Sequence, residues 1–195
     1  MDKETIDTYN REAERIAQLH STLTPCRIYE LIGKFFIKGG TTIDIGCGIG
    51  RDTNWLNNQH FSVIGVDASE GMLKQARQLY PKSTFKQDCL PKLDSVGDLQ
   101  FQNILCSAVL MHLDNDSIEN ACYRLLQLLT IGGCLIISIR GTNEDNKREN
   151  GKLYESIDVE SFSQFFKQNN CEILLYENEV EQKRQLTWHN FVIKK

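Results

Sequence analysis

TTIDIGCGIGR, residues 41–51, is the stretch that decides how the rest of this sequence is interpreted. Its first half is a short β-branched run typical of a buried strand, and its second half is a loop with glycine at positions 46, 48 and 50. Glycine permits a positive φ and lets backbone N–H groups come close to a ligand. We therefore predict a strand, a ligand-binding turn and the start of a helix; a plain strand–helix turn is the alternative.

A second strand is predicted over FSVIGV, residues 61–66, and Asp67 follows it directly. An acidic side chain at this point of an α/β sheet accepts hydrogen bonds from the ribose hydroxyls of a nucleotide. A dinucleotide fingerprint needs G-x-G-x-x-G, but the spacing here is G-x-G-x-G, and the sixth position from Gly46 is Arg51. Asp44 also precedes the loop, and a carboxylate there suits a ligand with an ammonium group better than a diphosphate.

Strands and helices alternate along the rest of the chain, which predicts a parallel sheet wound on both sides. Helices are expected over 2–20, from Pro25 to 37, from Ser69 to Leu79, over 117–129 with a stop at Gly132-Gly133, and over 158–169; strands are expected over 83–87, 101–109 and 134–140. EILLYENEV (172–180) and LTWHNFVI (186–193) are joined by a short polar link, which forces an antiparallel hairpin. The prediction is one α/β domain, with residues 1–38 as a helical cover and 40–195 as the core.

Composition narrows the class of protein. A chain of 195 residues suits a single core, and a net charge of −4 argues against a broad nucleic-acid surface without excluding a local basic rim. The seven cysteines are scattered without a C-x-x-C or Cys/His cluster, so we expect reduced thiols and no metal site. The charged start of the chain and the short apolar runs predict no secretory leader and no membrane span, hence a cytoplasmic protein.

Three short motifs together resemble the class I S-adenosylmethionine-dependent methyltransferases, most closely the small stand-alone bacterial kind. They are DIGCGIGR (44–51), VDAS (66–69) and QDC (87–89), and the resemblance covers roughly residues 40–140. It implies a Rossmann-like, doubly wound, mostly parallel seven-stranded sheet whose last strand is reversed. It also implies an enzyme that transfers a methyl group from S-adenosylmethionine to an acceptor, releasing S-adenosylhomocysteine. We expect this acceptor to be small or moderately sized. The motifs do not reveal the acceptor.

The resemblance assigns cofactor contacts position by position. The loop residues Asp44, Gly46, Cys47, Gly48, Gly50 and Arg51 are to shape the pocket around the methionine part and the ribose. By this resemblance, Asp67 is expected to bind the ribose hydroxyls, and Ala68 and Met72 are expected to line the adenine. Asp88 and Cys89 are expected to bind the edge of the adenine, and Ser107 is expected to lie beneath the sulfonium. Asp88 as a turn residue and Met72 as the apolar face of a helix are the alternatives.

The acceptor is expected beyond the carboxyl ends of the parallel strands, where ligands of open α/β sheets bind. His112, Arg140 and Trp188 are the candidate rim residues, and the reversed strand is also expected to bring Arg184 and His189 there. His112 is either a general base or a turn cap, and Trp188 is either a pocket wall or a packing residue. The N-terminal helices, with Tyr9, Asn10 and Arg15, either cover the cofactor or simply pack. The polar segment 141–152 is predicted to be a mobile lid.

Two other functions remain open at this point. One is a regulatory module that binds S-adenosylmethionine without turnover, and the other is a nicotinamide-dependent oxidoreductase on a related fold. The missing third glycine of the fingerprint argues against the oxidoreductase. The oligomeric state and the pathway have no signature in the sequence.

Overall fold

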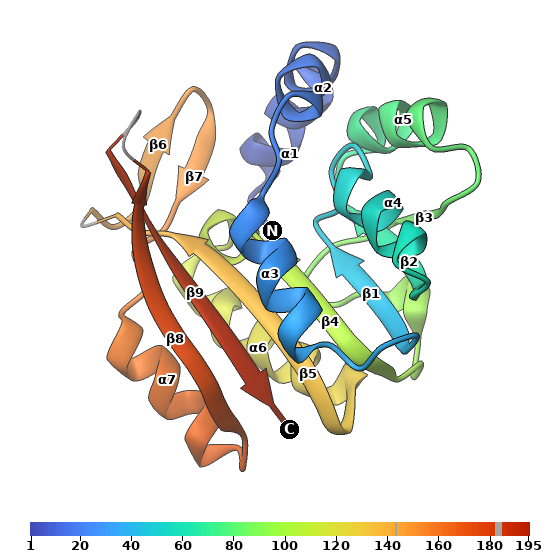
Figure 1. Ribbon diagram of the computed structural model, residues 1–195. Coiled ribbons are helices and arrows are strands. Elements are labelled where there is room, and N and C mark those ends of the chain that lie inside the picture. The colour runs from blue at the N-terminus through green and yellow to red at the C-terminus, as the bar shows by residue number, and fades with distance from the viewer. Residues whose placement is uncertain (143, 182–184) are drawn as a thin grey trace.

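A seven-stranded sheet forms the centre of the computed structural model, which describes residues 1–142, 144–181 and 185–195 (Figure 1). The helices are α1 (Lys3–Arg11), α2 (Ala13–Ser21), α3 (Cys26–Phe35), α4 (Arg51–Asn58), α5 (Glu70–Leu79), α6 (Asn115–Leu128) and α7 (Val159–Gln168), with short 3-10 turns η1 (Asp94–Val96) and η2 (Leu110–His112). The strands are β1 (Thr41–Ile45), β2 (Ser62–Asp67), β3 (Thr84–Gln87), β4 (Phe101–Ser107), β5 (Leu129–Arg140), β6 (Lys147–Glu149), β7 (Lys152–Tyr154), β8 (Glu172–Glu181) and β9 (Leu186–Lys194).

The strand order is β3-β2-β1-β4-β5-β9-β8. The first five of these strands pair in parallel, whereas β9 is antiparallel to both β5 and β8. This confirms the predicted Rossmann-like sheet with a reversed last strand. The carboxyl ends of β1, β2 and β4 meet at one edge of the sheet, and β9 begins at that edge because Trp188 lies opposite Arg140.

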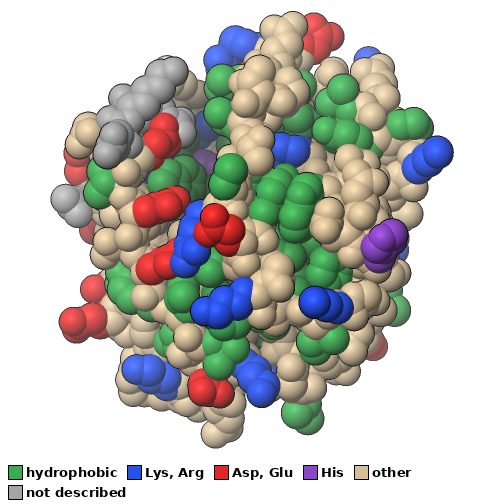
Figure 2. All heavy atoms as spheres, in the orientation of Figure 1, with side chains coloured by type: hydrophobic (Ala, Val, Ile, Leu, Met, Phe, Trp, Pro, Cys, Tyr) green, Lys and Arg blue, Asp and Glu red, His purple; other side chains and the backbone are tan. Residues whose placement is uncertain are grey.

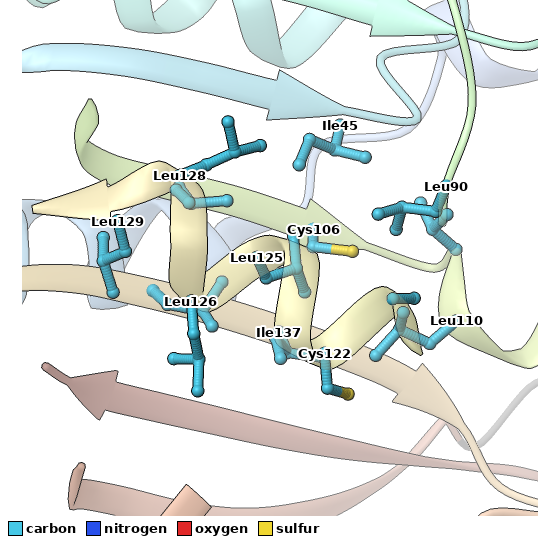
Figure 3. Packing of buried hydrophobic residues seen from close by; sticks show 14 of the residues in the cluster. Ile45, Leu90, Cys106, Leu110, Cys122, Leu125, Leu126, Leu128, Leu129 and Ile137 are labelled. Carbon is cyan, nitrogen blue, oxygen red and sulfur yellow. The ribbon is translucent and has the colours of Figure 1, made fainter. Parts of the chain in front are cut away.

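Helices cover both faces of the sheet because its inner strands are apolar on both sides. In Figure 1, α3 and α4 lie in front of the sheet, and Leu31 and Leu56 of these helices belong to one buried cluster with Ile136 of β5. A larger cluster lies on the other face, where α6 packs on β4 and β5. Figure 3 shows Leu125 and Cys122 of α6 among the side chains of that cluster.

The N-terminal segment forms two helices where one was predicted over residues 2–20. The backbone leaves the helical conformation at Glu12 (φ −104°, ψ 13°), so α1 ends there and α2 begins at Ala13. The two helices pack against different parts of the molecule. Residues of α2, including Ile16, join a small apolar cluster with Met72 of α5, while α1 lies on the hairpin formed by β6 and β7.

That hairpin gives regular structure to part of the segment 141–152, for which a mobile lid is predicted; its mobility stays a prediction. Strands β6 and β7 pair through Arg148 and Leu153, and the Leu153 N–H donates to Oγ1 of Thr5 in α1 (2.9 Å). Arg148 also forms an ion pair with Asp2 (2.8 Å). These polar residues predict a loop from the sequence alone. In the structure, pairing between the two strands and contacts with α1 order them.

The boundary after α6 also differs from the prediction. The helix ends at Leu128, and β5 starts at Leu129 instead of after Gly132-Gly133. The Gly132 N–H donates to the carbonyl of Lys195 (2.7 Å), and the Lys195 N–H donates to the carbonyl of Gly133 (3.1 Å). The glycines therefore pair with the end of the chain instead of capping the helix.

Candidate functional site

A pocket opens at the carboxyl ends of β1, β2 and β4, which is where the sequence places the ligand. The residues singled out from the sequence that line it are Tyr9, Gly46, Cys47, Gly48, Arg51, Asp67, Ala68, Met72, Asp88, Cys89, Ser107 and His112. They come from five separate segments, and parallel strand ends bring all but Tyr9 together. Their individual roles toward a cofactor stay predictions.

The glycines of the loop do different work, although all have a positive φ. A Cβ on Gly46 would lie 2.2 Å from Cγ2 of Val109, so this position requires glycine for packing. A Cβ on Gly48 would meet only the Met72 methyl, at 3.5 Å, and Gly48 lines the pocket. Gly48 is therefore the position where the backbone itself is open to a ligand.

Asp67 sits at the end of β2 and organises the loop around it. Its Oδ2 accepts from the Gly48 N–H (2.8 Å), and its Oδ1 accepts from the Ser69 N–H (2.8 Å). Burial raises the pKa of this carboxyl, although the two backbone donors act in the opposite direction. Each oxygen keeps a second lone pair, so the side chain still has acceptor capacity for ligand hydroxyls.

Asp44 and Gly50 do not line the pocket, which corrects their predicted place in it. Successive side chains of a strand point to opposite faces, so Ile45 reaches the pocket and Asp44 does not. Asp44 is buried and accepts from Oγ1 of Thr53 in α4 (2.6 Å), and burial raises the pKa of its carboxyl. Gly50 instead faces Phe85, whose ring would lie 2.5 Å from an added Cβ. Both residues therefore support the glycine loop without lining the pocket.

Asp88 lines the pocket but its carboxylate is already engaged. Its oxygens accept from the N–H groups of Cys89 (2.7 Å) and Ser95 (2.6 Å). Asp88 therefore acts as a turn residue, which is the alternative raised from the sequence, and its carboxylate holds the segment after β3. Arg51 is likewise held, because it pairs with Asp52 (2.8 Å) at the start of α4.

His112 is buried in the wall of the pocket, between α1 and the hairpin. Its Nδ1 lies 2.6 Å from the carbonyl of Leu153, and since a carbonyl only accepts, Nδ1 carries the proton. The neutral ring then offers its Nε2 lone pair to the hydroxyl of Tyr9, 3.4 Å away. Burial lowers the pKa of His112 to about 4 and raises that of Tyr9, so both side chains are neutral at pH 7.

Arg140 and Trp188 lie outside this pocket, so the prediction that they face it together with His112 is wrong. Trp188 is on β9, four positions from β2 in the strand order, roughly 19 Å at the usual strand spacing. It packs against the core cluster beneath the sheet. The Arg140 guanidinium forms two hydrogen bonds with Glu149 (2.8 Å each) and stacks over the ring of Tyr154 (4.1 Å to its centroid).

The other predicted rim residues are placed as follows. His189 bonds with the hydroxyl of Tyr176 on β8 (3.0 Å), away from the pocket lining, and Arg184 lies outside the described residues. Asn10 joins α1 to α5, since its side-chain oxygen accepts from Oγ of Ser69 (2.7 Å) and from the Gly71 N–H (2.9 Å). Arg15 pairs with Glu12 on the outside of α2.

Several lining residues were not assigned a ligand contact from the sequence. They are Met1, Thr5, Ile6, His20, Ile45, Ile49, Asp52, Ser69, Leu90, Ala108 and Val109. Those on α1 reach the pocket through contacts more than a hundred residues apart, such as Thr5 with Leu153. Strand alternation could have identified Ile45, whereas Ile49 and Val109 lie in the loops after β1 and β4, close to predicted residues.

The described residues, 1–142, 144–181 and 185–195, contain neither a metal-binding cluster nor a membrane-spanning helix. No set of three or more His, Cys, Asp or Glu side chains there is grouped so as to hold a metal ion. No helix in this part of the chain is long and apolar enough to cross a bilayer.

Comparisons with known proteins agree with this geometry. Residues 43–133 match a family described as a methyltransferase domain. A putative methyltransferase, 235L, of Invertebrate iridescent virus 6 is 41% identical over 66 residues, which span 33% of this chain and 22% of that protein. Trans-aconitate 2-methyltransferase of Methylobacterium nodulans is 33% identical over 107 residues, 53% of this chain and 39% of that protein. The chain thus matches less than half the length of these two relatives.

Solved structures share the fold. A SAM-dependent methyltransferase from Methanosarcina mazei superposes with a TM-score of 0.73 at 17% identity, covering 88% of this chain and 98% of that one. The 1,6-didemethyltoxoflavin-N1-methyltransferase of Burkholderia thailandensis, solved with S-adenosylhomocysteine, has a TM-score of 0.65 at 19% identity, over 95% of this chain and 77% of that one. The [4+2]-cyclase SpnF also matches, with a TM-score of 0.66 at 15% identity, over 87% of this chain and 80% of that one.

The sequence match and the fold point to the same family. The match over residues 43–133 contains the glycine loop and Asp67, and the sheet carries them in the strand order and with the reversed strand expected of that family. Residues 43–133 are thus similar to a methyltransferase-domain family, and the whole sheet has the fold of solved S-adenosylmethionine-dependent methyltransferases.

Proposed function

We propose that this protein binds S-adenosylmethionine in the pocket described above and transfers its methyl group to a small or moderately sized acceptor. The observation that carries the proposal is the joint placement of Gly48 and Asp67, with an open backbone and an acidic acceptor at one strand edge. The family match supports it independently, because it rests on sequence and not on geometry.

The pocket fits the cofactor chemically. Its lining combines the carboxylates of Asp52, Asp67 and Asp88 with apolar side chains such as Met72, which suits a cationic ligand that also carries a flat base. Asp67 would accept from the ribose hydroxyls, and Met72 and Ala68 would lie against the adenine. When bound, the sulfonium supplies a methyl group with a good leaving group; the protein has to position the acceptor in line and exclude water.

A small acceptor is favoured over nucleic acid. The net charge is −4, and Figure 2 shows acidic and basic side chains mixed on the face in view, without a continuous basic stripe. The relatives named above act on chemically different small molecules, so their names leave the acceptor open.

The main rival is a protein that binds the cofactor without methyl transfer. The fold match to the [4+2]-cyclase SpnF supports this rival, because proteins with one fold can carry out different reactions. The two functions differ in one product. The purified protein, incubated with S-adenosylmethionine and a small-molecule extract, should form S-adenosylhomocysteine, measured by mass spectrometry. Binding of the cofactor without any turnover in metabolite, RNA and protein extracts would favour the rival.

A further inference from the structure

The wall of the pocket formed by α1 and η2 carries a pair of polar side chains. The cofactor site proposed above takes the side of Gly48, Asp67 and Met72, which leaves the acceptor the side formed by α1, the end of β4 and η2. Tyr9 of α1 and His112 of η2 line this side, and the Tyr9 hydroxyl lies 3.4 Å from Nε2 of His112. Both are therefore polar groups that an acceptor can meet inside the pocket.

The direction of the hydrogen bond between them is determined from outside the pocket. Nδ1 of His112 lies 2.6 Å from the Leu153 carbonyl on β7 and carries the ring proton, so Nε2 can only accept. The Tyr9 hydroxyl therefore donates its single hydrogen to Nε2. What the Tyr9 oxygen still offers a ligand is a lone pair, which binds a hydrogen-bond donor and repels the oxygen of an anion.

The surroundings of this hydroxyl favour an uncharged ligand. Burial raises the pKa of Tyr9, and the nearby Tyr154 and Asp67 add to the effect, so the hydroxyl keeps its proton at pH 7. Lys152 stacks over the Tyr9 ring (4.3 Å to the centroid), so a second cation at the hydroxyl is unfavourable. Apolar side chains complete this part of the lining: Ile6, Leu90, Ala108 and Val109. The wall thus fits a mainly apolar molecule with one hydrogen-bond donor.

His20 is a second imidazole in the lining and comes from the end of α2. The carbonyl of Leu23, three residues further on, accepts from Nη1 of Arg51 (3.2 Å), which joins this end of α2 to the start of α4. Tyr9 and His112 instead belong to α1 and η2. The two imidazoles lie on different elements, so separate substitutions tell their roles apart.

We propose that the acceptor is a small uncharged hydroxyl compound, whose O–H donates to the Tyr9 oxygen and whose oxygen is methylated. The inference rests on the proposed function. The hydroxyl oxygen attacks the methyl carbon, and the bond from that carbon to sulfur breaks with its electron pair left on sulfur. The acceptor's proton passes to Tyr9 while Tyr9 passes its own to Nε2 of His112, and water takes it up once the products leave. The products are a methyl ether, S-adenosylhomocysteine and a proton.

A weak base is sufficient for this step. An oxygen that has gained a methyl group while it still carries its hydrogen is a strong acid, so neutral His112 can take the proton as the new bond forms. The contact between Tyr9 and His112 is long at 3.4 Å, and contacts of this kind shorten when the substrate is bound.

A panel of acceptors tests the chemical class. Phenols, alcohols, carboxylic acids, thiols and primary amines are incubated with methyl-labelled S-adenosylmethionine, and the products are identified by mass spectrometry. We expect methyl ethers, stable to mild base, from the hydroxyl compounds and no methyl esters from the acids.

Variants then test the two residues. Tyr9→Phe keeps the ring and should lower kcat/KM for the best hydroxyl acceptor about tenfold to a hundredfold, with the affinity for S-adenosylhomocysteine changed by less than about twofold. His112→Asn retains an N–H donor for the Leu153 carbonyl but loses Nε2, and it should act mainly on kcat. The double variant should be no slower than the slower single one, because the two residues act as a unit. Tyr176→Phe is the matched control and should leave kcat/KM unchanged, since the Tyr176 hydroxyl also bonds a histidine, His189 (3.0 Å), outside the pocket lining.

A readout without cofactor or acceptor tests the pair itself. Long-range proton–nitrogen correlation spectra should show His112 with its proton on Nδ1 at pH 7. Tyr9→Phe should shift the Nε2 resonance of His112, because the bond from the hydroxyl is lost, and Tyr176→Phe should not. A proton on Nε2 would reverse the bond to Tyr9 and overturn the inference.

The outcomes separate this inference from the proposed function. Methylation of acids, thiols or amines with the hydroxyl compounds inert overturns the inference and leaves the methyltransferase intact. Binding of S-adenosylhomocysteine without turnover of any hydroxyl compound in the panel also overturns it. Loss of turnover in His20→Gln with Tyr9→Phe unaffected would make His20 the base instead. Failure to bind S-adenosylhomocysteine at all would remove the proposed function itself.

Discussion

The two walls of the pocket are built in different ways. The cofactor wall consists of strand ends and a glycine loop, held by hydrogen bonds between neighbouring strand ends such as Gly48 N–H to Asp67 (2.8 Å). The opposite wall consists of side chains from α1, η2 and the β6–β7 hairpin, joined by long-range contacts such as Tyr9 with His112. The backbone of the strand ends and the loop determines the shape of the cofactor wall. The shape of the opposite wall depends on the side chains that α1, η2 and the hairpin contribute. The first wall thus suits a common cofactor, and the second can change with the acceptor.

The largest effect is expected on the cofactor wall, from Asp67→Ala. The change removes an acceptor for the ligand and for the Gly48 and Ser69 N–H groups; charged hydrogen bonds contribute about 1.5–3 kcal/mol each. Affinity for S-adenosylhomocysteine should fall about tenfold to a thousandfold in titration calorimetry. Asp116→Ala, on the exposed first turn of α6, changes the charge equally and should bind normally. Normal binding by Asp67→Ala would mean that the pocket has been misassigned.

The second prediction separates two glycines of one loop. Gly46→Ala should lower the free energy of unfolding by about 2–4 kcal/mol, because its Cβ would overlap Val109 and its φ is positive. Gly48→Ala should lose only about 1–2 kcal/mol, from its φ alone, yet weaken cofactor binding more than its stability loss explains. Urea unfolding and calorimetry on both variants measure the two quantities. Equal stability losses would contradict the division of roles.

His112, in the wall opposite the cofactor wall, should make the free energy of unfolding depend on pH. Burial lowers the pKa of His112 from 6.5 to about 4, so the unfolded state binds its proton first as the pH falls. The stability that neutral His112 contributes is therefore complete above about pH 6.5 and is lost as the pH falls toward 4. Between pH 7 and pH 5 the loss should be about 2 kcal/mol. His112→Asn should reduce this dependence by that amount in urea unfolding; an equal slope in both proteins would show that His112 titrates normally.

The smallest effect on the pocket is expected from Trp188. Because β9 lies far along the sheet from β2, Trp188→Ala should change the affinity for S-adenosylhomocysteine less than twofold. It should still lower the free energy of unfolding by about 1–3 kcal/mol, less than a full core truncation, since the side chain is only partly buried. A tenfold loss of cofactor affinity with unchanged stability would place Trp188 in the pocket after all.

The same contrast explains what the sequence could predict. Strand periodicity and glycine spacing identified β1, β2, the Ser69 cap of α5 and the place of Asp67, because these depend on residues close in sequence. The reversed β9 followed from a short link alone. The hairpin β6–β7 was missed because its strands are three residues each and polar, and it is held by Thr5 and Asp2 from the other end of the chain.

The errors in the site have a similar cause. Asp44 was placed in the pocket from its position before the loop, but strand alternation turns it toward Thr53. Arg140 and Trp188 do lie at the correct edge of the sheet, yet topology alone gave no distance along that edge. Glu149, the partner that holds Arg140, lies on the hairpin that the sequence did not reveal.

The most direct test of the central claim is a calorimetric titration of the purified protein with S-adenosylhomocysteine and, separately, with a nicotinamide dinucleotide. G-x-G-x-G followed by Asp67 gives room for a nucleoside with an amino-acid side arm and lacks the third glycine that brings a helix up to a diphosphate. We predict one-site binding of S-adenosylhomocysteine that Asp67→Ala weakens at least tenfold, and no heat with the dinucleotide. Binding of the dinucleotide alone would contradict the methyltransferase assignment.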